Sequence, residues 1–129
     1  MSTLKVNSIE EATSGGGTIF PARAWVNFDG EGTVSIRDNG RISSITDNSI
    51  GNYTANFSSS LANSNYCCNM SATDDGTGTN KNNGYAYGSW LRSSTSVVYN
   101  TGSIRIGIGY PANSSHYDVS HINISIVGD

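Results

Sequence analysis

The chain has 129 residues, a formal net charge of −3, and 25 residues that are Leu, Ile, Val or Phe. That length suits one domain, and the small charge together with seven Tyr and two Trp argues against intrinsic disorder despite a thin core. The seven Lys and Arg are scattered and form no basic stripe, which argues against nucleic-acid binding. No apolar run approaches membrane-spanning length, so membrane insertion is not expected.

Residues 1–22 differ in pattern from the rest and are expected to form an N-terminal arm. Leu4, Val6 and then Ile9 follow the spacing of a short strand, and the SGGG of Ser14–Gly17 is typical of a flexible linker. The apolar stretch of a secretory signal is absent, so we expect synthesis in the cytoplasm. The remaining residues, 23–129, are expected to form one head domain.

The head domain carries strand signals throughout. Ile outnumbers Leu by twelve to three, and Ser, Asn, Gly and Thr make up nearly half of the chain, a composition that favours strands and turns. Ala24, Val26 and Phe28 alternate with Trp25 and Asn27, which places the two sets on opposite faces of a strand. Apolar residues that alternate in the same way along later strands are Val34, Ile36, Tyr53, Ala55, Phe57, Tyr66, Cys68, Met70, Ile104, Ile106, Ile108, Ile122, Ile124 and Ile126.

Gly-containing turns separate these strand signals. The first two turns are predicted at Asp29–Gly32 and Asp38–Gly40. Strands that recur every 8–12 residues with turns between them are typical of an antiparallel β-sandwich or a barrel. No internal repeat and no sustained helical period is present, so the sequence predicts an all-β domain.

Cys67 and Cys68 are adjacent, which argues against a disulfide framework because neighbouring residues close only a strained ring. On a strand they point to opposite faces, and the simplest interpretation is two small apolar residues. A redox or metal role has little support because no second Cys pair exists. No cofactor is expected.

A long polar loop is predicted at Thr73–Gly84, which has almost no apolar residue. Within it, the DDGTGTN of Asp74–Asn80 places oxygen-bearing side chains around glycines, as calcium-binding loops do. The closing Glu of an EF-hand loop is missing. A solvated loop is the favoured interpretation, and a cation site at Asp74 and Asp75 is the alternative.

An enzyme is not expected, and no catalytic residue is assigned. His116 and His121 are five residues apart, a spacing that cannot place both on one side of a regular strand. No G-x-S-x-G motif occurs. Acidic residues suited to glycoside hydrolysis lie in predicted turns, where they serve turn geometry; they are Asp29, Glu31, Asp74 and Asp75.

Aromatic residues in or beside the predicted loops, Thr73–Gly84 and Tyr110–Asp118, are candidate receptor contacts. Short polar residues flank them, and an aromatic ring stacks on the C–H face of a sugar while polar groups meet its hydroxyls. The candidates are Tyr85, Tyr87, Trp90, Tyr110, His116 and Tyr117. The alternative is that Tyr85 and Tyr87, spaced as on a strand, belong to a core or an interface.

The segment Ala24–Tyr66, AWVNFDGEGTVSIRDNGRISSITDNSIGNYTANFSSSLANSNY, carries a long motif. It resembles the C-terminal domain of tail fibre proteins from marine and other tailed phages, which shows A-W-V-N-F-[ND]-G-x-G-T-V-x-I-R and then S-S-I-T-D-N-G. The chain departs from that pattern at Asp38–Ile42 and at Ser60–Asn63. The ending DVSHINISIVGD is similar to the closing strand of the family, and STLKVNSI resembles the N-terminal segment of fibre-like virion proteins.

The resemblance implies a virion appendage protein that is exposed on the phage particle and recognises the host surface. It implies an all-β homotrimer, so we expect an antiparallel β-sandwich or jelly-roll-like head whose N-terminal arm binds other virion proteins. Contacts with a host glycan or protein are expected in residues 71–115 or so, which the motif does not cover, whereas Ala24–Asn48 is expected to be scaffold. The alternative is a purely structural virion component, a capsid decoration or tail knob protein without a receptor.

Overall fold

The computed structural model describes residues 2, 22–75, 89–90, 98–110 and 115–128. These residues form nine strands and no helix, and accordingly the described chain holds no helix long and apolar enough to cross a membrane. The first strand begins at Ala24. Nearly all of the expected N-terminal arm lies outside the described residues.

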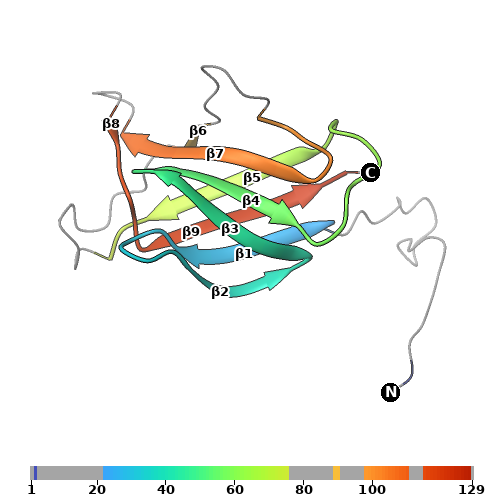
Figure 1. The fold of residues 1–129 in the computed structure, drawn as a ribbon, viewed down its shortest axis with the longest axis horizontal. Coiled ribbons are helices and arrows are strands. Elements are labelled where there is room, and N and C mark those ends of the chain that lie inside the picture. Colours follow the sequence, from blue (N-terminus) through green and yellow to red (C-terminus); the bar gives the residue numbers. More distant parts are fainter. Residues whose placement is uncertain (1, 3–21, 76–88, 91–97, 111–114, 129) are drawn as a thin grey trace, which may run out of the picture.

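The strands form two antiparallel sheets that face each other (Figure 1). The β1 sheet has the order β2 (Ser35–Gly40), β1 (Ala24–Asp29), β9 (His121–Val127) and β5 (Cys67–Thr73). The β4 sheet has the order β3 (Ile42–Ser49), β4 (Asn52–Phe57), β7 (Ser103–Tyr110) and β6 (Ser89–Trp90), with β8 (Ser115–His116) paired to the end of β7. The predicted all-β, antiparallel sandwich is therefore confirmed for the described residues.

The core lies between the two sheets and follows the alternation of the sequence. Ala24, Val26 and Phe28 are buried on the inner face of β1, as predicted. The rings of Phe28 and Tyr53 meet edge to face with their centres 5.3 Å apart, which joins the β1 sheet to the β4 sheet. Full burial of a large apolar side chain such as that of Phe28 contributes about 1.5–3 kcal/mol to folding. The predicted alternating residues that prove buried are Tyr53, Ala55, Phe57, Tyr66, Ile104, Ile106, Ile108, Ile122, Ile124 and Ile126.

The chain passes from the β1 sheet to the β4 sheet at Arg41, whose φ of 63° is in the left-handed region. A turn was predicted at Asp38–Gly40, and that prediction is wrong because these residues still belong to β2. Gly40 pairs with Trp25 of β1, so the strand continues to the last residue before the chain changes direction. Arg41 is the one non-glycine residue with positive φ in the described part of the chain.

Candidate functional site

The aromatic residues predicted as receptor contacts divide into two groups. Tyr85 and Tyr87 lie outside the described residues. The backbone of β6 pairs at Trp90 with Gly107, and that of β8 pairs at His116 with Gly109, so both short strands meet the last four residues of β7 (Figure 1).

Tyr110 ends β7, and Tyr117 directly follows β8. The structure therefore gathers four of the six candidates, Trp90, Tyr110, His116 and Tyr117, at one end of the β4 sheet. The prediction of an irregular loop from Tyr110 to Asp118 is wrong in one respect: the short strand β8 lies within it. These two residues of β8 pair with Gly109 and Tyr110 at the end of β7.

A second surface was not predicted as a site. It is the part of the outward side of β1, β9 and β5 formed by the six outward side chains named below, here called the Trp25 face. An open depression of about 420 Å³ lies on it. The side chains that point outward around the depression are Trp25, Asn27, Asn69, Ser71, Asn123 and Ser125.

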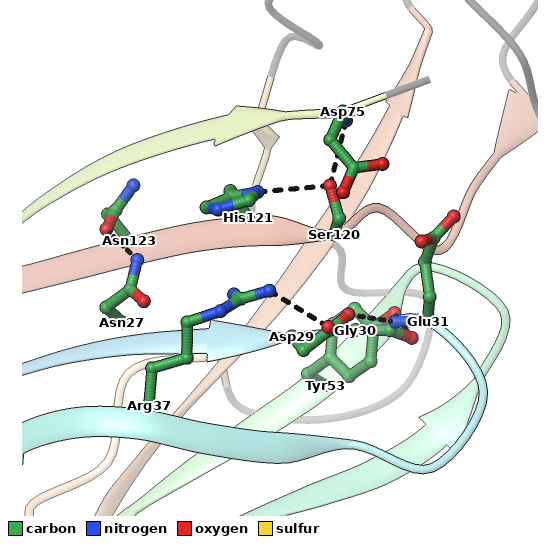
Figure 2. Close-up of polar contacts among 10 residues, drawn as sticks. All are labelled: Asn27, Asp29, Gly30, Glu31, Arg37, Tyr53, Asp75, Ser120, His121 and Asn123. Carbon is green, nitrogen blue, oxygen red and sulfur yellow. Dashed lines mark hydrogen bonds and ion pairs between the residues drawn. The ribbon is translucent and has the colours of Figure 1, made fainter. Parts of the chain in front are cut away.

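Two rows of side chains cross the Trp25 face. In one row, Asn27 donates from Nδ2 to Oδ1 of Asn123 at 2.6 Å (Figure 2), and Asn123 donates from Nδ2 to Oγ of Ser71 at 3.2 Å. In the next row the register places Trp25 beside Ser125, and Ser125 beside Asn69. The strand pairing thus holds a tryptophan and a set of amide and hydroxyl groups side by side.

Trp25 is 38% exposed although it is a large apolar side chain. Its indole lies against Gly40 of the edge strand β2, where a Cβ atom would overlap the indole Nε1. The sequence did hold a signal for this residue, because the alternation with Val26 already placed Trp25 on the outer face. Scaffold was nevertheless expected for the whole of Ala24–Asn48, and the structure places part of that segment in an open depression.

The structure also brings three carboxylates together at one end of the β1 sheet. Carboxylate oxygens of Glu31, Asp74 and Asp75 lie within 4.8 Å of one another, and these three residues are called the acidic cluster. Desolvation raises the pKa of Glu31, and the charges of Asp74 and Asp75 raise it further. Glu31 was not predicted to join the two aspartates, because the β1–β2 turn is distant from them in sequence.

Hydrogen bonds fix the backbone around the acidic cluster (Figure 2). The amide of Glu31 donates to Oδ1 of Asp29 at 2.9 Å, and Arg37 donates to Oδ2 of the same Asp29 at 2.9 Å. The amide of Asp75 donates to Oγ of Ser120 at 2.9 Å. Carboxylate oxygens are among the ligands that Ca²⁺ takes, but Ca²⁺ takes six to eight oxygen ligands in all, and the acidic cluster has three carboxylates. A cation at Asp74 and Asp75 therefore stays a prediction.

Ser120 and His121 make a Ser–His contact of the kind that nucleophilic catalysis uses. Nδ1 of His121 lies 3.1 Å from Oγ of Ser120 (Figure 2). Ser120 is 2% exposed, and its hydroxyl already accepts the hydrogen bond from Asp75. A nucleophile must reach its substrate, so this buried hydroxyl serves to anchor the chain at the start of β9.

The described residues thus form a small antiparallel β-sandwich. At one end of its β4 sheet the strands β6 and β8 meet β7, and its β1 sheet carries the Trp25 face. No protein-family model, no curated protein and no solved structure matches the chain. The resemblance to phage tail fibre domains therefore depends on the sequence alone, chiefly on the motif at Ala24–Tyr66.

Proposed function

We propose that the protein is a phage virion appendage protein, like a tail fibre or tail knob, which recognises the host surface during adsorption. The observation that carries this proposal is the tail-fibre-like motif of Ala24–Tyr66. In the structure this segment forms β1 to β4 and contributes to both sheets. The motif is therefore a fold signature, and the receptor contacts are proposed to lie on the surfaces that the scaffold carries.

The proposed receptor surface is the end of the β4 sheet where β6 and β8 meet β7. Trp90, Tyr110, His116 and Tyr117 are its proposed contacts, together with Tyr85 and Tyr87, which lie outside the described residues. The partner is a glycan or a protein of the host cell surface. Neither a cofactor nor an enzymatic activity forms part of the proposal.

The proposed assembly is a homotrimer with a jelly-roll-like head, attached to other virion proteins through residues 1–22. The thin core supports association, because three-fold contacts bury apolar surface that a single small domain leaves in water. Many copies on one particle multiply weak individual contacts into firm attachment. Light scattering tests the trimer: a mass near three times 13.6 kDa is expected, and a mass near 13.6 kDa contradicts it.

The function is tested with cells of the bacterium on which the phage grows. Labelled protein is expected to bind these cells saturably, and an excess of unlabelled protein is expected to slow phage adsorption. A bacterial strain to which the phage does not adsorb is the control. Absence of binding, with loss of particle stability when the gene is deleted, would instead favour a purely structural virion component.

A further inference from the structure

We propose that the Trp25 face binds a neutral saccharide. The inference rests on the proposed function only for its biological meaning, namely that the saccharide belongs to the host surface. The Trp25 face is a different surface from the end of the β4 sheet. Binding to this face is itself measurable without a host cell. Three features of the face carry the inference: an exposed aromatic ring, a fixed array of hydrogen-bonding groups, and the absence of charge among its lining side chains.

The aromatic ring is that of Trp25. Gly40 supports one side of the indole, since the missing side chain lets the ring rest against β2. The ring is nevertheless 38% exposed and borders the depression. An exposed, supported indole offers an apolar surface for the C–H groups of a pyranose ring.

The hydrogen-bonding array is held in one arrangement by its own contacts. Oδ1 of Asn123 accepts from Asn27, and Nδ2 of Asn123 donates to Ser71. This arrangement leaves Oδ1 of Asn27 as an acceptor and the hydroxyl hydrogen of Ser71 as a donor. Asn69 is exposed, and its side-chain amide makes no hydrogen bond to the described residues. Alternating donors and acceptors of this kind match the hydroxyls of a sugar, and prior ordering lowers the entropic cost of binding.

Charge selects the class of saccharide. None of the six outward side chains of the Trp25 face is charged, and the neighbouring Asp29 is paired with Arg37 at 2.9 Å (Figure 2). A neutral sugar fits this lining better than a uronate or sialate, which requires a cationic partner when it is desolvated. Trp25 and Asn69 lie two strand spacings apart, about 10 Å, which accommodates sugar rings lying across the strands.

A second copy of the chain is the competing occupant of this face. Stable interfaces bury about 800 Å² per partner. The Trp25 face has a single large apolar side chain, and its other five outward groups are amides and hydroxyls. The fixed amide and hydroxyl groups match the hydroxyls of a sugar, so a saccharide is the proposed occupant, and the test below treats the second copy as an outcome.

The test uses the full chain and its tryptophan fluorescence. The chain has two tryptophans, so the Trp90→Phe variant leaves Trp25 as the single indole emitter. Glucose-, galactose-, mannose- and rhamnose-based oligosaccharides are titrated, with uronate oligosaccharides for comparison. The emission of Trp25 is expected to change saturably with at least one neutral series and not with the uronates.

Variants of the face assign the site by calorimetry with the neutral oligosaccharide that binds. Trp25→Ala and Asn69→Ala are expected to weaken binding about ten-fold or more each. Ile50→Ala is the matched control, because Ile50 is the other exposed large hydrophobic residue of the described chain and lies in the β3–β4 turn. Unchanged affinity in Ile50→Ala is expected.

Three outcomes overturn the inference: no saturable change with any neutral series, unchanged affinity in Trp25→Ala, or conversion of an oligomer to a monomer by Trp25→Ala. The last outcome means that another copy covers the face. Host-cell adsorption is scored separately on the unaltered chain. Saccharide binding without adsorption leaves this inference standing and contradicts the proposed function, whereas adsorption without saccharide binding does the reverse.

Discussion

The hydroxyl of Tyr53 lies 2.6 Å from Oδ1 of Asp118, which joins β4 to the segment between β8 and β9. The same hydroxyl lies 3.0 Å from the carbonyl oxygen of Gly30, and the same carboxylate oxygen accepts from the amide of Gly51 at 2.7 Å. Burial, together with the hydrogen bond to Asp118, raises the pKa of Tyr53 above its ordinary range. Three segments of the chain therefore meet at the buried hydroxyl of Tyr53, and the β3–β4 turn meets the carboxylate of Asp118 beside it.

Removal of this hydroxyl is expected to destabilise the sandwich. Tyr53→Phe keeps the ring contact with Phe28 but removes a hydrogen bond to a charged acceptor, which is worth about 1.5–3 kcal/mol. The free energy of unfolding in urea measures the loss. Tyr66→Phe is the comparison, since the Tyr66 hydroxyl lies near the neutral carbonyls of Asn100 and Ser103 at 3.1 and 3.2 Å and its loss is expected to cost about 1 kcal/mol. An equal or smaller cost for Tyr53→Phe would contradict the role given to Asp118.

Glu31 is expected to make stability depend on pH. Because desolvation and the nearby carboxylates of Asp74 and Asp75 raise its pKa in the folded state, folding favours the protonated form. The stabilising contribution of protonated Glu31 to the free energy of unfolding is therefore present at low pH and is lost as the pH rises through the folded-state pKa. Glu31→Gln removes this penalty, so we expect it to raise the melting temperature near pH 7 more than near pH 4.

The charged groups that raise the pKa of Glu31 also include Asp29 and Asp118, so the measurement is made at low salt, where screening is weak. Asp38→Asn is the matched control for Glu31→Gln. Asp38 is exposed on β2 and accepts a hydrogen bond from the amide of Asn39 at 2.8 Å, which an asparagine also accepts. A gain in Glu31→Gln that is the same at both pH values, or no larger than that of Asp38→Asn, would refute the coupling.

The inner faces of the strands were predictable because alternation has a period of two. Ala24, Val26 and Phe28 follow it without interruption. The crossing at Arg41 was not predictable, because a left-handed arginine has no sequence signature and the preceding Asp38–Gly40 favours a turn. The error therefore moved the end of β2 and not its half-buried Ile36, which packs against the core.

The candidate sites were less predictable because they depend on strand order. Glu31 meets Asp74 and Asp75 only because β9 lies between β1 and β5 in the β1 sheet. Likewise Trp25 and Asn69 face one depression only through their register with Ser125. Such pairings join residues far apart in the chain, and a single sequence does not specify them.

The adjacent thiols are expected to react at different rates. Cys67 is exposed, whereas Cys68 is half-buried and its pKa is raised to about 11 by desolvation. Since the thiolate is the reactive form, one thiol per chain is expected to react promptly with a disulfide reagent such as DTNB under native conditions, and both in denaturant. Cys67→Ser is expected to abolish the fast phase and Cys68→Ser to retain it. Two native thiols with the same rate would contradict the opposite placement of these side chains.

Gly51, in the turn between β3 and β4, is expected to tolerate no side chain. Its φ is 61°, and a Cβ there would overlap the carbonyl oxygen of Ile108 and lie 2.7 Å from the amide nitrogen of Tyr117. The carbonyl of Gly51 also accepts from the amide of Ile108 at 2.7 Å, so the turn cannot move away without breaking its contact with β7. Gly51→Ala is therefore expected to cost clearly more than the 1–2 kcal/mol or so of left-handed strain alone.

Gly32→Ala separates the two parts of that cost. Gly32 has nearly the same φ, 59°, but a Cβ there would meet nothing within 4 Å. The Gly32 variant is thus expected to show only the backbone strain of about 1–2 kcal/mol. Urea unfolding of both variants, with unchanged m-values as the check that the two-state comparison holds, gives the difference. Equal costs would mean that the β3–β4 turn does not press against β7 and the segment before β9, and that the packing of Gly51 plays no part in closing this end of the sandwich.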